Sequence, residues 1–154
     1  MYNIFKTFLK KKKSIIYTQD ELDNKLFDSI YSHNYKLFCE MIKLGANINI
    51  VKTLPSLIYY YFDMSPLQCI IYNWKGSNKK QYKFLKVLFE SNANLSGTMY
   101  NNYPVMLYEF DAYETIIGKI NSKYKENILN CLIKNYPNYM KEKKLKEDIN
   151  KYNL

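Results

Sequence analysis

Arginine is absent from the 154-residue chain, and lysine supplies all 23 of its fully charged basic residues. A basic surface without arginine lacks the planar fork that favours recognition of guanine and phosphate, which argues against sequence-specific reading of DNA. Glycine is scarce too, with only four residues, and no glycine-rich phosphate loop occurs among them. Recognition of nucleotides or of a DNA sequence is therefore a poor explanation of this chain.

Cysteine is limited to Cys39, Cys69 and Cys131, an odd number at wide spacing. This pattern argues against a disulfide framework and a zinc site, and it favours a reducing compartment. No apolar run approaches the roughly 18 residues of a membrane span. The N-terminus places its lysines after its apolar residues, the reverse of a secretory signal. We expect a cytoplasmic protein.

Catalytic residues are scarce. His33 is the single histidine, and a place in a helix–helix turn is favoured over a role as general base. Glu109, Asp111 and Glu114 lack the alternating ligands and glycine of a calcium loop, so a solvated charged loop is favoured over a cation site. Neither G-x-S-x-G nor H-E-x-x-H occurs. We expect no enzymatic activity, no metal and no cofactor.

The residues that are present describe a folded, basic chain. Hydrophobic residues make up 47% and charged residues 24%, a globular composition whose length favours a single domain. The 14 acidic residues leave a net charge of +9. A charge of this size speeds association with negative surfaces, so the partner is expected to be acidic.

Three segments share one pattern, with apolar residues at i, i+1, i+4 and i+5, which predicts one stripe of an amphipathic helix in each. A short exit follows each stripe, and Gly45 and Asn92 suit the left-handed conformation that often ends a helix. The stripes and exits are Leu37-Phe38-Met41-Ile42 with Gly45 to Asn49, Phe84-Leu85-Leu88-Phe89 with Asn92 to Ser96, and Ile128-Leu129-Leu132-Ile133 with Tyr136 to Met140.

The middle unit opens with Ser65-Pro66-Leu67-Gln68 and closes with Glu90-Ser91-Asn92-Ala93-Asn94. These segments resemble the opening T-P-L-H and closing G-A-D-V-N motifs of the ankyrin repeat. The first unit shares the closing motif, and the third is the weakest match. Closing motifs lie 47 and then 44 residues apart, against about 33 in ordinary ankyrin repeats. The resemblance implies an all-α, ankyrin-like helical solenoid with long insertions between repeats and with cap helices at its ends.

The expected organisation has three parts. Residues 1–17 form a basic amphipathic segment. Residues 18–140 hold about three repeats, near 18–50, 65–96 and 103–140. Residues 141–154 form a charged cap helix. Thr18 with Glu21 reads as a capping box that opens the first helix.

The resemblance implies protein binding through the loops between repeats and the surface of the first helices. Aromatic residues at these places supply contact area at low entropic cost. For each of them, packing of the ring within the protein is an open alternative, and Trp74 could hold either a partner or its own loop. The candidate partner-binding residues are Tyr59, Tyr60, Tyr61, Asp63, Tyr72, Trp74, Tyr100, Asn102 and Phe110.

The function expected is a non-enzymatic protein–protein interaction module that captures an acidic partner by steric means. An inhibitor, a toxin-immunity protein or a small adaptor would suit a lone domain of this kind, and a monomer is favoured. The alternative is tethering to nucleic acid or an anionic membrane through a basic patch at Lys10, Lys11, Lys12 and Lys13.

Overall fold

The computed structural model describes residues 16–55, 61–102, 105–120 and 123–152, and within these residues the protein is mostly helical. The basic patch Lys10 to Lys13 and the predicted binding residues Tyr59 and Tyr60 lie outside the described residues. The helices are α1 (Gln19–Tyr31), α2 (Tyr35–Lys43), α3 (Pro66–Tyr72), α4 (Asn78–Glu90), α5 (Ala112–Lys119), α6 (Lys125–Asn135) and α7 (Pro137–Tyr152).

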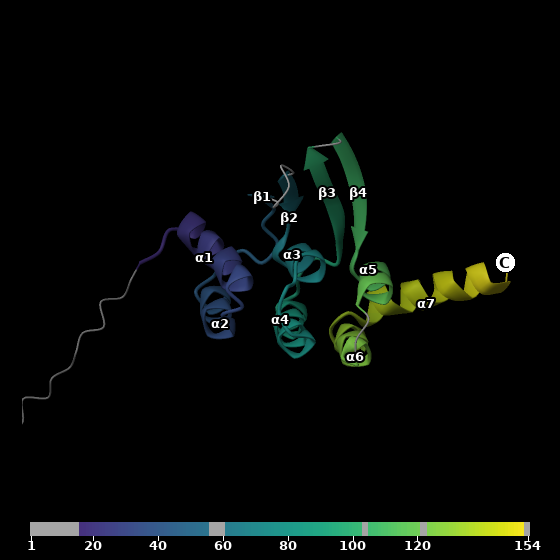
Figure 1. Cartoon of the computed structure of the whole chain (residues 1–154). Helices are drawn as coiled ribbons and strands as arrows, with labels where there is room; N and C mark the ends of the chain where they lie inside the picture. Colours follow the sequence, from purple (N-terminus) through teal and green to yellow (C-terminus); the bar gives the residue numbers. More distant parts are fainter. Residues whose placement is uncertain (1–15, 56–60, 103–104, 121–122, 153–154) are drawn as a thin grey trace, which may run out of the picture.

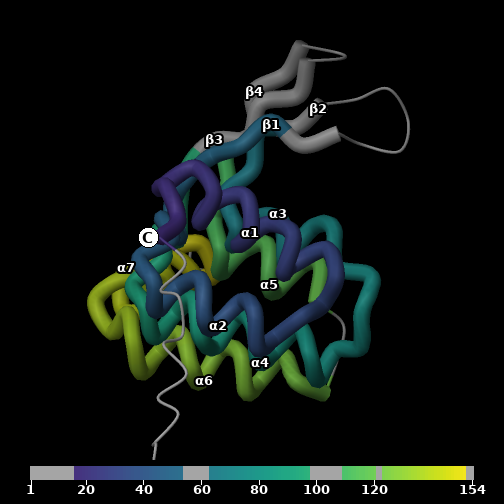
Figure 2. The backbone as a smooth tube through the Cα atoms, turned by 90° about the vertical axis from the view of Figure 1, so that its left-hand side faces the viewer, coloured from purple at the N-terminus to yellow at the C-terminus, as the bar shows by residue number. Residues whose placement is uncertain are grey.

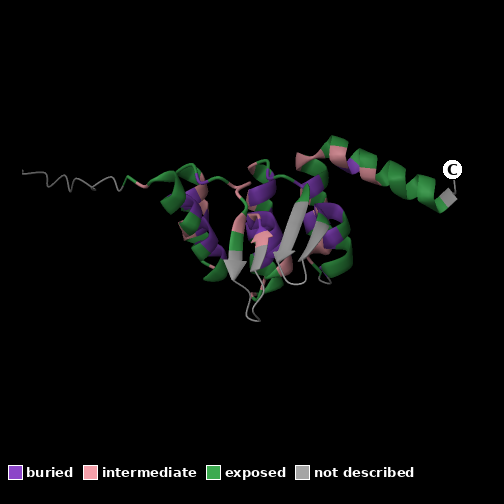
Figure 3. Ribbon diagram, turned by 90° about the horizontal axis from the view of Figure 1, so that it is seen from above, coloured by how far each residue is buried: buried purple, intermediate pink, exposed green. Residues whose placement is uncertain are grey.

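The first six helices form three antiparallel pairs that stack side by side in two layers (Figure 1). Helices α1, α3 and α5 contact one another in sequence along the upper layer, and α2, α4 and α6 do so along the lower layer. Most residues of the predicted apolar stripes face the interior, but Ile133 of the third stripe is 41% exposed. The largest fully buried side chains include Phe38, Phe84, Phe89 and Leu132. Figure 3 shows that buried residues concentrate where neighbouring pairs meet.

Local chemistry explains where the helices begin. Thr18 and Glu21 form the predicted capping box at α1. Ser65 forms a second one with Gln68 at α3, where Pro66 occupies the first turn and loses no intrahelical hydrogen bond. Ser77 caps α4 through the Lys80 amide. Each side chain satisfies a backbone donor that would otherwise lack a partner.

The exits of α2 and α4 are alike, as the sequence predicts. Gly45 has φ +97° and Asn92 has φ +61°. The amide of Ala46 donates to the Met41 carbonyl at 3.0 Å, and the amide of Ala93 donates to the Leu88 carbonyl at 3.1 Å. Each bond joins an amide to the carbonyl five residues earlier, as in the Schellman motif that ends many helices.

The third predicted exit differs from the other two. Residues 136 to 140 contain no left-handed residue and instead lead directly into α7, which begins at Pro137. Met140 is buried, but the distal part of α7 extends away from the stack, with Leu145 60% exposed and Ile149 39% exposed (Figure 1). The C-terminal helix is present, although its apolar residues pack on the last pair only near its start.

Two β-hairpins, which the sequence pattern does not predict, fill the long insertions before α3 and α5. The strands are β1 (Lys52–Pro55), β2 (Tyr61–Met64), β3 (Ser96–Asn102) and β4 (Val105–Asp111). They pair antiparallel in the order β1-β2-β3-β4, so the two hairpins form one four-stranded sheet. This sheet rises from the upper layer of helices (Figure 1).

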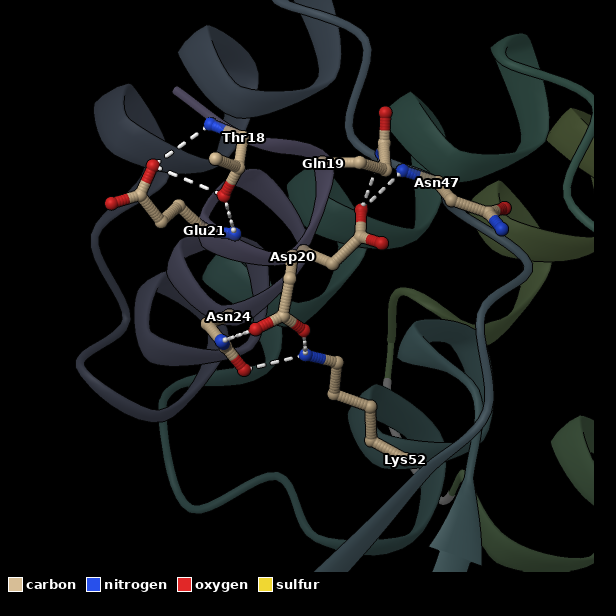
Figure 4. A network of polar contacts seen from close by, with 8 residues as sticks. Thr18, Gln19, Asp20, Glu21, Asn24, Asn47 and Lys52 are labelled. Atoms are coloured by element: carbon tan, nitrogen blue, oxygen red, sulfur yellow. Dashed lines mark hydrogen bonds and ion pairs between the residues drawn. The ribbon is translucent and has the colours of Figure 1, made fainter. Parts of the chain in front are cut away.

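A network of polar contacts ties α1 to the segment that leads into the sheet (Figure 4). The Lys52 ammonium lies 3.2 Å from an Asp20 carboxylate oxygen and also donates to the Asn24 side chain. The buried Asp23 carboxylate accepts from the Asn47 amide at 2.7 Å. These acidic groups already have partners within the protein, so they serve its structure.

Candidate functional site

In each helix pair one connection joins the first helix to the second. The connections of the three pairs lie on the same side of the stack (Figure 2). Their described residues, together with the adjoining helix ends, are 31–36, 72–83, 119–120 and 123–125. We call this surface the turn edge. It is the place where residues from all three helix pairs come together at solvent.

Aromatic rings line the turn edge. Tyr31 is 49% exposed and Tyr35 is 39% exposed. The rings of Tyr82 and Tyr124 stack with their centroids 6.0 Å apart and their planes at 15°, which links the second helix pair to the third. Aromatic rings that are partly exposed and held in place offer contact area without a further loss of side-chain entropy.

Lysine ammonium groups lie over several of these rings. Lys119 is 4.8 Å from the centroid of the Tyr72 ring. Lys83 lies 5.8 Å from the ring of Tyr35 on the neighbouring pair, at the outer limit for such a contact. Lys123 is 5.5 Å from the ring of Tyr124. Because these contacts orient the ammonium groups without neutralising them, the positive charge stays available.

The charge of the turn edge is strongly positive. The lysines of the turn edge are Lys36, Lys75, Lys79, Lys80, Lys83, Lys119, Lys123 and Lys125. These ranges contain no acidic residue, and Asp28 and Glu126 are the acidic residues nearest to them in sequence. Among the residues that the structure describes, none of these lysines forms an ion pair. An excess of ammonium groups that no carboxylate neutralises produces a field that attracts an acidic surface.

Trp74 lies in the middle connection and packs on its own protein. Its ring centroid is 4.5 Å from that of His33 and 5.1 Å from that of Phe84. Its indole N–H donates to the Ser77 carbonyl at 3.2 Å, and the ring covers Gly76, where a Cβ would come within 3.0 Å of it. Of the two roles left open by the sequence, this geometry fits the one in which Trp74 holds its own turn.

His33 occupies the first connection, as the sequence predicts, with a positive φ of 52°. In the described part of the chain its ring contacts Trp74. The contact joins the first connection to the second, so His33 contributes to the shape of the turn edge.

The other predicted binding residues are placed as follows. Tyr72 lies at the end of α3, on the turn edge. Phe110 is only 3% exposed and packs near the Tyr72 ring, with centroids 6.2 Å apart, so its side chain presents little surface to a partner. Asp63 in β2 accepts from the Thr53 hydroxyl at 2.6 Å. The backbones of Tyr61, Tyr100 and Asn102 lie in strands β2 and β3, while their side chains fall outside the described part.

Sequence reasoning missed Tyr35, Tyr82, Lys83 and Tyr124 as members of one surface. They lie next to or within the first turns of the second helix of each pair, so the repeat register places them at one end of the stack. That shared position relative to the repeats was the signal available. Because lysine is abundant throughout the chain, the lysines at this position do not stand out in the sequence.

The acidic group near β4 has structural partners. The Asp111 carboxylate lies 2.6 Å from the Lys143 ammonium and accepts from the Tyr139 hydroxyl at 2.7 Å. Burial would raise the pKa of Asp111, but these hydrogen bonds and one from the Glu114 amide outweigh it and lower the pKa below its usual value. Within the described residues no group of histidine, cysteine and acidic side chains could hold a metal ion.

Burial also shifts the pKa of one thiol, Cys69, and of one phenol, Tyr31. Burial raises the pKa of the Cys69 thiol to about 11, and the hydrogen bond with Tyr31 lowers it only in part. Burial likewise raises the pKa of Tyr31. Both groups therefore stay protonated at neutral pH, and a thiol in that state is a poor nucleophile.

No helix in the described ranges is both long enough and apolar enough to cross a membrane. Comparison of the chain with protein-family models, curated proteins and solved structures gives no match.

Proposed function

We propose that this chain is an ankyrin-like solenoid that acts as a non-enzymatic protein-binding module, and that the turn edge captures an acidic surface of its partner. The observation that carries the proposal is the set of lysines held over tyrosine rings on one edge, without ion pairs among the described residues. Charge steers the partner to this edge, and the exposed rings supply the contact area.

The ankyrin-like part of the proposal is supported by the recurrence of local structure. The exits of α2 and α4 place a left-handed residue, Gly45 or Asn92, at the same position and use the same hydrogen bonds. The side chain of Asn49 accepts from the Asn94 amide at 2.7 Å, joining one closing segment to the next. Recurring contacts of this kind are what a stack of similar units requires.

The proposed mechanism is steric. The turn edge spans three helix pairs, so a partner bound along it would contact residues of all three pairs. Such coverage suits an inhibitor or a toxin-immunity protein, which blocks the partner's own working surface. A small adaptor would use the same contact to recruit the partner.

Affinity capture from the lysate of the source cell tests the proposal, with nuclease treatment and a moderate-salt wash. The test variant changes Lys79, Lys83, Lys119 and Lys123 to Gln. The matched control changes Lys134, Lys141, Lys144 and Lys146 to Gln, all exposed residues away from the turn edge. We expect the wild type and the control to recover one stoichiometric protein and the test variant to lose it.

Three results would contradict this proposal. Equal recovery by the two variants would remove the turn edge from binding. Recovery of material that nuclease releases, with no protein left on the wild type, would favour the alternative of nucleic-acid tethering. Recovery of anionic lipid with no stoichiometric protein would favour membrane tethering.

A further inference from the structure

The two edges of the four-stranded sheet differ in how they are protected. Strand β1 forms one edge, has only four residues and contains Lys52 and Pro55. Shortness, lysine and proline are the usual means by which a protein prevents another strand from pairing with an edge. Strand β1 is therefore protected against pairing with another strand.

Strand β4 forms the opposite edge and has none of these protections. It pairs with β3 over seven consecutive residue pairs, from Ser96 with Asp111 to Asn102 with Val105, without a bulge. Its sequence, Val-Met-Leu-Tyr-Glu-Phe-Asp, contains neither lysine nor proline. Within the described residues β3 is its one strand neighbour, so the backbone groups on its outer side face away from the sheet.

From this asymmetry we infer that two copies of the chain associate through β4. The two β4 strands pair antiparallel about a twofold axis and extend the sheet from four strands to eight. A twofold contact uses the same surface on both copies, so β4 meets a strand of its own length and composition. This association is separate from capture of an acidic partner at the turn edge.

The charge distribution favours a second copy as the occupant. With a net charge of +9, two copies repel each other wherever their lysines meet. No lysine occurs between Lys86 and Lys119, a stretch that contains all of β3 and β4. The Lys143 ammonium reaches the end of β4 from α7, but the Asp111 carboxylate neutralises it at 2.6 Å. The β4 edge is therefore a surface where the lysines of two copies repel each other little.

The surroundings of β4 leave room for a neighbouring strand. The β3–β4 hairpin projects from the helices, and α5 and α7 lie below the base of β4 (Figure 1). Paired strands need a separation of only about 4.8 Å. The sequence favours a monomer, and the overall repulsion makes the expected dimer weak and dependent on concentration.

Sedimentation velocity of the purified full chain tests the inference between about 10 µM and about 1 mM, the range in which a weak dimer with a dissociation constant near 100 µM would form. Two variants, Leu107→Lys and Tyr108→Lys, introduce a lysine at neighbouring positions in the middle of β4. Asn130→Lys, on the exposed surface of α6, is the control with the same change in charge. Circular dichroism establishes that each variant is folded.

We expect the wild type to shift from monomer to dimer across this range. Each folded β4 variant should weaken dimerisation about tenfold, because two like charges then face each other near the twofold axis. Asn130→Lys should dimerise like the wild type. In hydrogen exchange, amides of residues 105–111 should gain protection as concentration rises.

A wild type that stays monomeric at every concentration would overturn the inference. So would a dimer that survives both β4 substitutions, because its contact would then lie elsewhere. Neither result bears on the lysine variants of the turn edge, so failure here is distinguishable from failure of the proposed function.

Discussion

The side chain of Asn49 accepts a hydrogen bond from the backbone amide of Asn94 at 2.7 Å, across 45 residues of sequence. Asn49 belongs to the segment that follows α2, and Asn94 belongs to the corresponding segment after α4. The amide of Asn49 in turn donates to the side chain of Asn47 at 3.0 Å. A short polar side chain in one exit thus positions the backbone of the next, which couples the first two helix pairs.

Replacement of Asn49 with alanine tests this coupling. We expect Asn49→Ala to lower the free energy of unfolding by about 1 kcal/mol, the usual contribution of one such hydrogen bond. Asn49→Asp keeps an acceptor at the same place and should retain most of the stability. Urea unfolding followed by circular dichroism measures both. Equal losses for the two variants would show that the acceptor is unimportant.

Two glycines in different conformations allow the same substitution to have opposite effects. Gly45 has φ +97°, where a Cβ is strained, so Gly45→Ala should lower stability by about 1 kcal/mol. Gly118 lies inside α5 with open space around its Cβ position, so Gly118→Ala should raise stability by about 0.5–1 kcal/mol. Thermal unfolding of both variants checks the sign. A loss for both would contradict the assigned backbone conformations.

The helix boundaries were predictable because they depend on neighbouring residues. The side chains of Thr18 and Ser65 each accept from a first-turn amide of α1 and α3, whatever surrounds them. Pro66 suits the start of α3 because it has no amide hydrogen to leave unpaired. Gly45 likewise ends α2 through its own conformational freedom. Local chemistry of this kind can be read from a few consecutive letters.

The sheet and the turn edge were not predictable, because they depend on contacts between distant segments. Strands β2 and β3 pair through Phe62 with Asn101 and Asp63 with Tyr100, which brings two separate insertions together. The stacked rings of Tyr82 and Tyr124 likewise come from different helix pairs. No pattern within either segment specifies such a partner, and only the stacking of the pairs brings them together.

The contact between Asp111 and Lys143 should make stability depend on pH. Hydrogen bonds lower the pKa of Asp111 in the folded protein, so its contribution is present above the unfolded pKa of about 3.9 and is lost as pH falls toward the folded value. Asp111→Asn keeps an N-cap for α5 but removes the charge that pairs with Lys143. At pH 7 we expect it to cost about 1 kcal/mol after allowance for solvent screening.

Thermal unfolding of the wild type and Asp111→Asn at several pH values measures this effect. The difference between them should be largest near pH 7 and should shrink below about pH 4, where the wild-type carboxylate begins to be protonated. A difference that is constant with pH would mean that the lost stability comes from packing or capping.

Trp74 provides a test of whether the turn edge is preformed. Its ring lies 5.1 Å from that of Phe84 and 4.5 Å from that of His33, and both contacts disappear in Trp74→Ala. Because the ring is only partly buried, we expect a loss of about 2 kcal/mol, less than for a fully buried tryptophan. Trp74→Phe keeps an aromatic ring against Phe84 and should lose clearly less.

Circular dichroism is the suitable measure for these two variants, because Trp74 is the single tryptophan and its fluorescence is lost with it. Lys83→Gln, also on the turn edge, serves as the control and should leave the unfolding temperature nearly unchanged, since surface charges contribute little to stability. If Trp74→Ala unfolds at the wild-type temperature yet weakens capture of the partner, the ring contacts the partner directly. If it unfolds earlier, as we expect, the ring instead fixes the shape of the turn edge before the partner arrives.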